Sequence, residues 1–293
     1  MVCIFCQSSH VHKDGNHKGF QRYKCMSCGK RFDGEKYESG GFINHFNTRL
    51  KKTDRNKLTR ELYCNPKKEI DYNEKKNIQM AKEFIETKGR PPLLCPPSYY
   101  NIPNDVFEDE EHYTDEYIDR HYKNCMENFD LNMQYFEKLD YDKFDKYLRR
   151  FVKKNKFIEI MDLAEVNGKR GAYILVLDEY KQAYIGISSS EKGIKGRILQ
   201  HWSKQKEFSR LLNGRVETSI LSIDSFGALD TTRIFYKEVK WYQDLNTYEE
   251  KLVGEFKPEY RLNRVAGGLN SEENSGLRNL QLMASIQKRE FEK

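Results

Sequence analysis

Residues 171–178 read Gly-Ala-Tyr-Ile-Leu-Val-Leu-Asp, and residues 182–188 read Gln-Ala-Tyr-Ile-Gly-Ile-Ser. Both are short, largely apolar runs, which is typical of buried strands. The segment that joins them, Asp178-Glu179-Tyr180-Lys181, has the polarity of a hairpin turn. The sequence therefore predicts an antiparallel β-hairpin, with Tyr173 on its first strand and Tyr184 on its second.

A helix is expected after this hairpin, from about residue 195 to residue 208. Arg197 and His201 are four residues apart within it, so they lie on one face of the helix. Residues 216–223 alternate in polarity and predict a third strand, whereas residues 231–242 fit a helix or a strand. The expected centre is a three-stranded antiparallel sheet flanked by helices.

A last helix is predicted to begin near Thr247 and to end before Pro258. Thr247 and Glu250 have the spacing of a capping box. Glu249 and Glu250 compete for a catalytic role in this helix. The spacing to Leu252-Val253 favours Glu249, and the capping box accounts for Glu250.

Together these residue types supply what phosphodiester hydrolysis requires, which is a nucleophile, charge neutralisation and leaving-group stabilisation. Glu249 offers a hard oxygen ligand for Mg²⁺ or Mn²⁺, and Arg197 can contact two phosphate oxygens. Tyr173 or Tyr184 could accept the proton of the attacking water if its pKa were lowered from about 10. His201 could shuttle that proton or bind phosphate.

Residues 170–268 resemble a GIY-YIG nuclease domain. Gly-Ala-Tyr stands for the first motif and Tyr-Ile-Gly for the second, followed by Arg-x3-His, by Glu-x2-Leu-Val and by a segment ending at Asn263. The resemblance implies catalytic roles for Tyr173, Tyr184, Arg197, His201, Glu249 and Asn263, the asparagine orienting the glutamate or water. Ala172 replaces the usual isoleucine, but strand alternation points it away from the Tyr173 face. The gap between Tyr184 and Arg197 is slightly long.

The first 34 residues contain two Cys-x2-Cys pairs, Cys3/Cys6 and Cys25/Cys28. Four thiolates at this spacing predict a structural, tetrahedral Zn²⁺ site, which would stabilise a segment too short to form its own core. The segment resembles the zinc ribbons of transposase-associated proteins. That resemblance implies DNA contact through Arg22, Lys24, Lys30 and Arg31.

The remaining segments are less informative. Residues 35–103 are predicted to be basic and helical with a proline-rich linker, where Lys88 and Arg90 lie in a Lys-Gly-Arg-Pro sequence similar to the core of minor-groove-binding peptides. A Pro-rich linker is the simpler interpretation. Residues 104–168 are expected to be helical, residues 169–270 form the nuclease domain, and residues 271–293 form a tail.

Charge is unevenly distributed along the chain. Residues 1–60 contain 13 Lys/Arg and 5 Asp/Glu, whereas residues 104–146 contain 5 and 14. A basic N-terminal module suits a polyanionic partner. No run of eighteen apolar residues predicts a membrane span, and the first residues lack the pattern of a signal peptide, so we expect a cytoplasmic protein without a membrane partner.

The sequence thus predicts an α+β protein: a small zinc ribbon, a mainly helical middle region and a C-terminal GIY-YIG domain. The expected function is metal-dependent cleavage of double-stranded DNA, in a phage or mobile element. The alternatives are a non-cleaving DNA-binding protein and an RNA-binding or RNA-processing factor. Target site, cut pattern and oligomeric state do not follow from the sequence.

Overall fold

The computed structural model describes residues 3, 5–6, 8–17, 20–33, 42–50, 55–70, 72–89, 106–109, 111–189, 191–203, 208–212, 216–241 and 244–264. Some predictions lie outside these residues, namely those on Arg90, the linker at 91–97, the glycines at 266–268 and the tail at 271–293. The described part has six α-helices and three antiparallel sheets, so it is α+β as predicted. None of its helices is long and apolar enough to cross a membrane.

The central sheet has four antiparallel strands in the order β6-β9-β7-β8, not the three that were predicted, because a short strand in the middle region, β6, pairs with β9. These strands are β6 (Ile158–Ile160), β9 (Arg233–Glu238), β7 (Gly171–Leu177) and β8 (Gln182–Ser188). The predicted β7–β8 hairpin is confirmed, and a 3-10 turn over Asp178–Tyr180 joins its strands. Lys181 completes this turn with a positive φ of 51°.

The third strand predicted at 216–223 is wrong. That segment holds two 3-10 turns, Val216–Thr218 and Ile223–Ser225, and the third strand of the sheet is β9, where the pattern was ambiguous. Side chains satisfy the carbonyls that a strand would have paired. Asn128 and Asn132 both donate to the carbonyl of Ser219, and Arg264 donates to that of Ile220. Buried carbonyls with such partners need no neighbouring strand.

Both faces of the sheet are covered. Alternate residues of β7 divide between two cores: Tyr173, Leu175 and Leu177 face one, and Ala172, Ile174 and Val176 face the other. The first core includes α6 (Gly193–Ser203), α4 (Asp115–Lys138) and parts of residues 46–64, and the second includes α5 (Tyr141–Asn155) and α7 (Leu245–Glu255). Ala172 points away from the Tyr173 face, as predicted.

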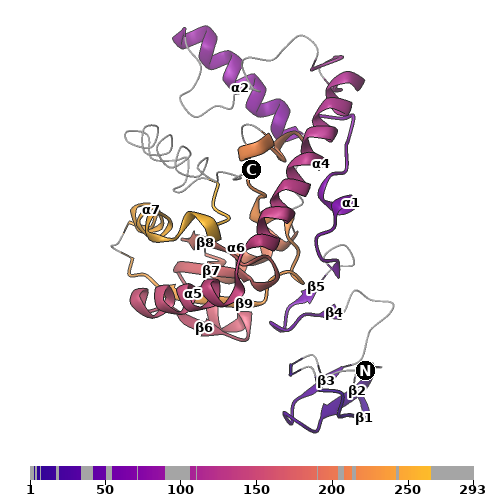
Figure 1. Ribbon diagram of the computed structural model, residues 1–293, viewed down its shortest axis with the longest axis vertical. Coiled ribbons are helices and arrows are strands. Elements are labelled where there is room, and N and C mark those ends of the chain that lie inside the picture. The colour runs from indigo at the N-terminus through magenta and orange to yellow at the C-terminus, as the bar shows by residue number, and fades with distance from the viewer. Residues whose placement is uncertain are drawn as a thin grey trace.

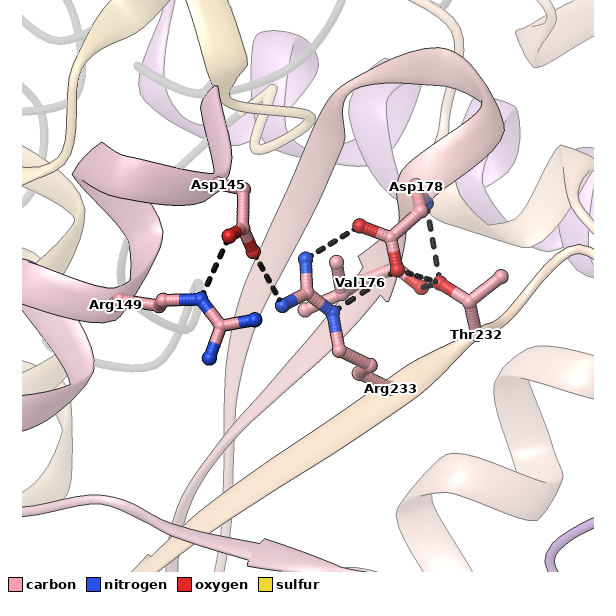
Figure 2. A network of polar contacts seen from close by, with 6 residues as sticks. All are labelled: Asp145, Arg149, Val176, Asp178, Thr232 and Arg233. Atoms are coloured by element: carbon pink, nitrogen blue, oxygen red, sulfur yellow. Dashed lines mark hydrogen bonds and ion pairs between the residues drawn. The ribbon is translucent and has the colours of Figure 1, made fainter. Parts of the chain in front are cut away.

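Within the helical region predicted at residues 104–168, the apolar residues Phe144, Leu148 and Phe151 recur at helical spacing, and they are the buried residues of α5. An ion network holds this helix to the sheet (Figure 2). Arg233 of β9 donates to Asp145 of α5 over 2.7 Å and also pairs with both carboxylate oxygens of Asp178. Thr232 adds a hydrogen bond of 2.6 Å to Asp178.

The capping box predicted for α7 is wrong. The N-cap is Asp244, which accepts hydrogen bonds from the backbone N–H groups of Asn246 and Thr247, both at 3.1 Å. Thr247 is already inside the helix, and its hydroxyl donates to the same carboxylate. Aspartate is as good an N-cap as threonine, and its position three residues earlier starts the helix at Leu245.

The N-terminal residues form separate small elements (Figure 1). Strands β1 (Val11–His17), β2 (Phe20–Cys25) and β3 (Arg31–Asp33) form one sheet, and β4 (Phe42–Ile43) and β5 (Arg49–Leu50) form a hairpin. They precede α1 (Arg60–Tyr63) and α2 (Tyr72–Lys88), and α2 confirms the helix predicted over residues 73–86.

Candidate active site and metal centre

Two of the residues predicted to be catalytic are hydrogen bonded. The hydroxyl of Tyr173 on β7 lies 2.8 Å from Nε2 of His201 on α6. Both side chains are buried, with 0% and 4% of the residue exposed. This contact joins the first motif of the hairpin to the helix that follows it.

Asp224 continues the chain of contacts, and the sequence analysis missed it. Its Oδ1 lies 2.6 Å from Nδ1 of His201. An ionised carboxylate only accepts hydrogen bonds, so it fixes the tautomer with a proton on Nδ1 and leaves Nε2 to accept from Tyr173. Asp224 lies in the turn Ser222-Ile223-Asp224-Ser225, where Ser222 caps the 3-10 segment. The Ser-x-Asp pattern indicates such a turn, but not its distant partner.

Tyr184 completes an aromatic group around His201. Its ring meets the imidazole edge-to-face with centroids 5.0 Å apart, and the centroids of the two tyrosine rings are 6.3 Å apart. Gly186 makes this arrangement possible, because a Cβ there would lie 2.5 Å from Cζ of Tyr173 and 2.9 Å from Cε1 of Tyr184. The glycine of the Tyr-Ile-Gly motif thus provides the space in which Tyr173 lies across β8.

Neither tyrosine is predisposed to ionise. Burial raises the pKa of Tyr173 well above its usual range, Tyr184 and Glu249 raise it further, and Arg197 opposes them without prevailing. Burial and then Glu249 likewise raise the pKa of Tyr184. Arg197 lowers the pKa of both tyrosines as predicted, but desolvation is the larger effect, so Arg197 alone does not bring either pKa below its usual range.

Arg197 and Glu249 approach this group from two different helices. Arg197 is exposed on α6, where its Nη1 donates to Gln200 over 2.5 Å. Glu249 lies on α7 with only 7% exposed, whereas Glu250 is half-buried. The charges of Arg197 and Glu249 act on both tyrosines, so the structure brings five of the six predicted catalytic residues into one neighbourhood.

Asn263, the sixth, has a different set of contacts. Its Oδ1 accepts from the backbone N–H of Ile185 at 3.0 Å, and its Nδ2 donates to the carbonyl of the same residue at 2.6 Å. The amide therefore pairs with β8 as a strand backbone would. This contact attaches the last described residues to the strand that carries Tyr184, and the role of Asn263 in orienting Glu249 or water stays a prediction.

Lys169 and Tyr236 form a further polar pair that sequence analysis missed. Tyr236 on β9 is directly opposite Tyr173 in the strand register, so the two side chains share a face of the sheet. Nζ of Lys169 donates to the Tyr236 hydroxyl over 3.0 Å, and this bond raises the pKa of the lysine. The Lys169–Tyr236 pair could not be predicted, because the pattern of residues 231–242 did not distinguish a strand from a helix.

The four N-terminal cysteines come together as the zinc prediction requires. Their sulfur atoms all lie within 4.8 Å of one another, with Cys3–Cys28 at 3.7 Å and Cys6–Cys25 at 3.5 Å. Tetrahedral Zn–S bonds of about 2.3 Å place sulfur atoms about 3.8 Å apart, so the set fits a metal ion such as zinc. Across the described residues, no other group of three or more His, Cys, Asp or Glu side chains is this close.

The predicted DNA-binding residues of the ribbon lie mainly on one side of its sheet. Arg22 and Lys24 alternate with Tyr23 on β2, and Lys24 is paired in register with Arg31. Tyr23 stacks on Phe32 on the opposite side, so it packs the ribbon as expected. Arg31 forms an ion pair of 2.6 Å with Asp14, and Lys30 lies 4.7 Å above the ring of Phe5.

Lys88 is exposed at the end of α2. It lies outside both groups of residues described above.

Comparisons with models of protein families, with curated proteins and with solved structures gave no match for this chain.

Proposed function

We propose that the protein is a metal-dependent DNA endonuclease in which residues 169–270 form a GIY-YIG nuclease domain. The observation that carries the proposal is the buried chain of contacts from Tyr173 through His201 to Asp224, with Arg197 and Glu249 acting on the same tyrosine. A tyrosine, a histidine, an arginine and two carboxylates in one place are a set suited to phosphodiester hydrolysis.

In the proposed mechanism the proton leaves water by way of Tyr173. Because burial disfavours a free tyrosinate, the hydroxyl passes its own proton to Nε2 of His201 as it accepts the proton of water. His201 becomes an imidazolium ion, and the carboxylate of Asp224 at Nδ1 stabilises that positive charge. The resulting hydroxide attacks phosphorus, and the ester oxygen leaves.

Glu249 and Arg197 serve the phosphate in this proposal. Glu249 is a single buried carboxylate, which suits Mg²⁺ or Mn²⁺ because these ions are often held by one or two carboxylates together with phosphate and water. When bound, such an ion would neutralise charge on the scissile phosphate. Arg197 is exposed on the same side as the tyrosines and would bind phosphate oxygens.

The zinc ribbon would bind double-stranded DNA outside the catalytic domain. Arg22 and Lys24 share a face of β2, and this face would contact phosphates. Arg31 would contribute less to DNA binding than its charge implies, because the ion pair with Asp14 already neutralises that charge. Reduced cysteines that hold zinc also suit the cytoplasm as the compartment. A phage or mobile-element origin rests on the two sequence resemblances alone.

The test is cleavage of supercoiled plasmid by the wild type, by Glu249→Gln and by Glu250→Gln, each with Mg²⁺ and with EDTA. We expect the wild type to cut with Mg²⁺ only, Glu249→Gln to lose several orders of magnitude in rate, and Glu250→Gln to remain active. The neighbouring glutamate is the matched control, since it is half-buried and does not cap the helix.

Two results would favour the other functions. DNA binding without cleavage of plasmid under any metal would indicate a non-cleaving binding protein. Faster cleavage of a matched RNA than of DNA would indicate an RNA-processing enzyme. Neither outcome is compatible with the proposed activity.

A further inference from the structure

Trp241 is the most exposed large apolar side chain among the described residues, with 85% of its surface accessible. It follows β9 by three residues and precedes α7. An isolated exposed apolar residue needs no special explanation. The position of Trp241 and the charge around it are the observations that suggest a binding role.

The backbone that carries Trp241 is attached to the beginning of the catalytic strand. Nη1 of Arg170 donates to the carbonyls of Val239 and Lys240 at 3.0 and 2.6 Å, and the N–H of Val239 donates back to Arg170 at 3.2 Å. Glu238 pairs with Gly171 in the strand register. The backbone that leads to Trp241 is therefore bonded to the residue that precedes β7, the strand that carries Tyr173.

The first turn of α6 adjoins the same segment from its other side. The N–H of Ile194 donates to the carbonyl of Lys169 at 2.9 Å, and a Cβ on Gly193 would lie 2.5 Å from the Lys169 nitrogen. Residues 168–171 therefore run between the start of α6 and the segment that leads to Trp241. The start of α6 and the segment that leads to Trp241 therefore both contact residues 168–170, directly before the strand that carries Tyr173.

Four lysines lie on these segments, and we call them the basic rim: Lys169, Lys192, Lys195 and Lys240. Lys192 and Lys240 are exposed and the other two are half-buried. With Arg170 and Arg197 they make six cations, and the acidic side chains beside them are Glu165, Glu191, Glu238 and Asp244. The segments next to Trp241 thus carry more positive than negative charge, which suits a polyanion.

We propose that Trp241 and the basic rim form a nucleic-acid contact surface of the catalytic domain, in which the indole stacks on a base beside the scissile phosphate while the lysines bind neighbouring phosphates. The location of that phosphate rests on the proposed function. Aromatic side chains bind bases in this way in single strands and in kinked duplexes, where an apolar side chain enters between base steps. A surface for sequence-independent phosphate binding alone would need lysines but no exposed indole.

Fluorescence tests this contact directly, because the chain has only two tryptophans and the other, Trp202, is buried with 7% exposed. Full-length, zinc-loaded protein without added Mg²⁺ is titrated with a 30-base-pair duplex and with the same duplex carrying an unpaired base. Trp241→Phe is the blank that isolates Trp202. We expect the Trp241 emission to be quenched by the DNA and to be protected from acrylamide.

Affinity gives the second measurement. Stacking on one base contributes enough that Trp241→Ala should weaken binding by about 5- to 150-fold, with Trp241→Phe losing less. Tyr72→Ala is the matched control, because Tyr72 is also an exposed aromatic (76%) and lies on α2, away from β9 (Figure 1). It should leave the affinity unchanged.

Unchanged Trp241 emission together with wild-type affinity of Trp241→Ala would overturn this inference while plasmid cleavage still supported the proposed function. Loss of affinity without any change in emission would also contradict it, since the indole would then act only through the fold. A wild type that neither binds nor cuts DNA would remove the proposed function and this surface together.

Discussion

Asp224→Asn is the substitution that examines the proton path most closely. The carboxylate can only accept a hydrogen bond, and it lies 2.6 Å from Nδ1 of His201. An asparagine that turned its NH₂ group toward the ring would favour the opposite tautomer, with the proton on Nε2. His201 would then donate to Tyr173 instead of accepting from it. The geometry of the site would persist, but the proton acceptor would be lost.

The size of the effect follows from the contact. The side chain of His201 is 5% exposed and that of Asp224 is 22% exposed, so solvent screens the pair only weakly. A hydrogen bond to a charged group contributes about 1.5–3 kcal/mol. Because the imidazolium ion forms only during the reaction, this energy is lost mainly from the transition state, which corresponds to a decrease in kcat of about 10- to 150-fold.

The assay is steady-state cleavage of plasmid, with kcat and KM determined separately and the unfolding free energy measured on the same samples. We expect kcat to decrease while KM and Kd for DNA stay within about twofold. Asp109→Asn is the matched control, because Asp109 pairs with His112 over 2.9 Å on the surface, with side chains 54% and 37% exposed. Wild-type kcat for Asp224→Asn, or a decrease matched by loss of folded protein, would refute the relay.

Other predictions concern metal, DNA and stability. Metal analysis of protein purified without chelator should find about one zinc per chain, and Cys25→Ser should abolish it. Deletion of residues 1–34, which hold six Lys/Arg and two Asp/Glu, should flatten the dependence of log K on log salt without stopping cleavage; an unchanged slope would exclude a phosphate contact. Gly186→Ala should greatly reduce kcat, because its methyl group would displace the Tyr173 ring. Nicking rates measure this loss of activity, and thermal unfolding of the same samples separates it from a loss of folded protein. Burial alone would raise the pKa of Asp145, but hydrogen bonds and charge from Arg149 and Arg233 outweigh it and lower the pKa. Asp145→Asn should therefore reduce the free energy of unfolding by about 1–2 kcal/mol at pH 7. The reduction should become smaller as the pH falls below about 4, where the carboxylate is protonated, and urea unfolding measures it.

Local patterns were sufficient for the elements whose partners are adjacent in the sequence. The β7–β8 hairpin could be predicted because two apolar runs are separated by a polar turn, and α5 because Phe144, Leu148 and Phe151 recur at helical spacing. The four cysteines were predictable for a similar reason, since thiolate spacing within each pair decides whether one ion can be shared. In each case the physical cause lies within a few residues of the pattern.

The wrong N-cap of α7 concerned a residue only three positions away, but the other contacts that were not predicted have a partner far away in the chain. Residues 216–223 alternate like a strand, but side chains from α4 and from Arg264 take the carbonyls of Ser219 and Ile220. Asp224 has its role only because His201, 23 residues away, points at it. The amide of Asn263 pairs with the backbone of Ile185, 78 residues away, and this contact was not predicted. No local pattern encodes these contacts.

Distant contacts also affect the proposed chemistry, because they bury Tyr173 and burial raises its pKa. Phe46, between β4 and β5, stacks on Trp202 with ring centroids 6.1 Å apart, directly beside His201 on α6, and its carbonyl accepts from Leu163. Phe46, Leu50, Tyr63 and Cys64 thus belong to the wall that shields the Tyr173–His201 pair from bulk water. A fragment beginning at residue 169 would retain the proposed catalytic residues but would lose this wall, together with α4, α5 and β6. Bulk water, beyond the one reacting molecule, would then compete with His201 for the hydrogen bond on which the proton transfer depends. The proposed chemistry therefore requires the residues before 169 as well as the motifs.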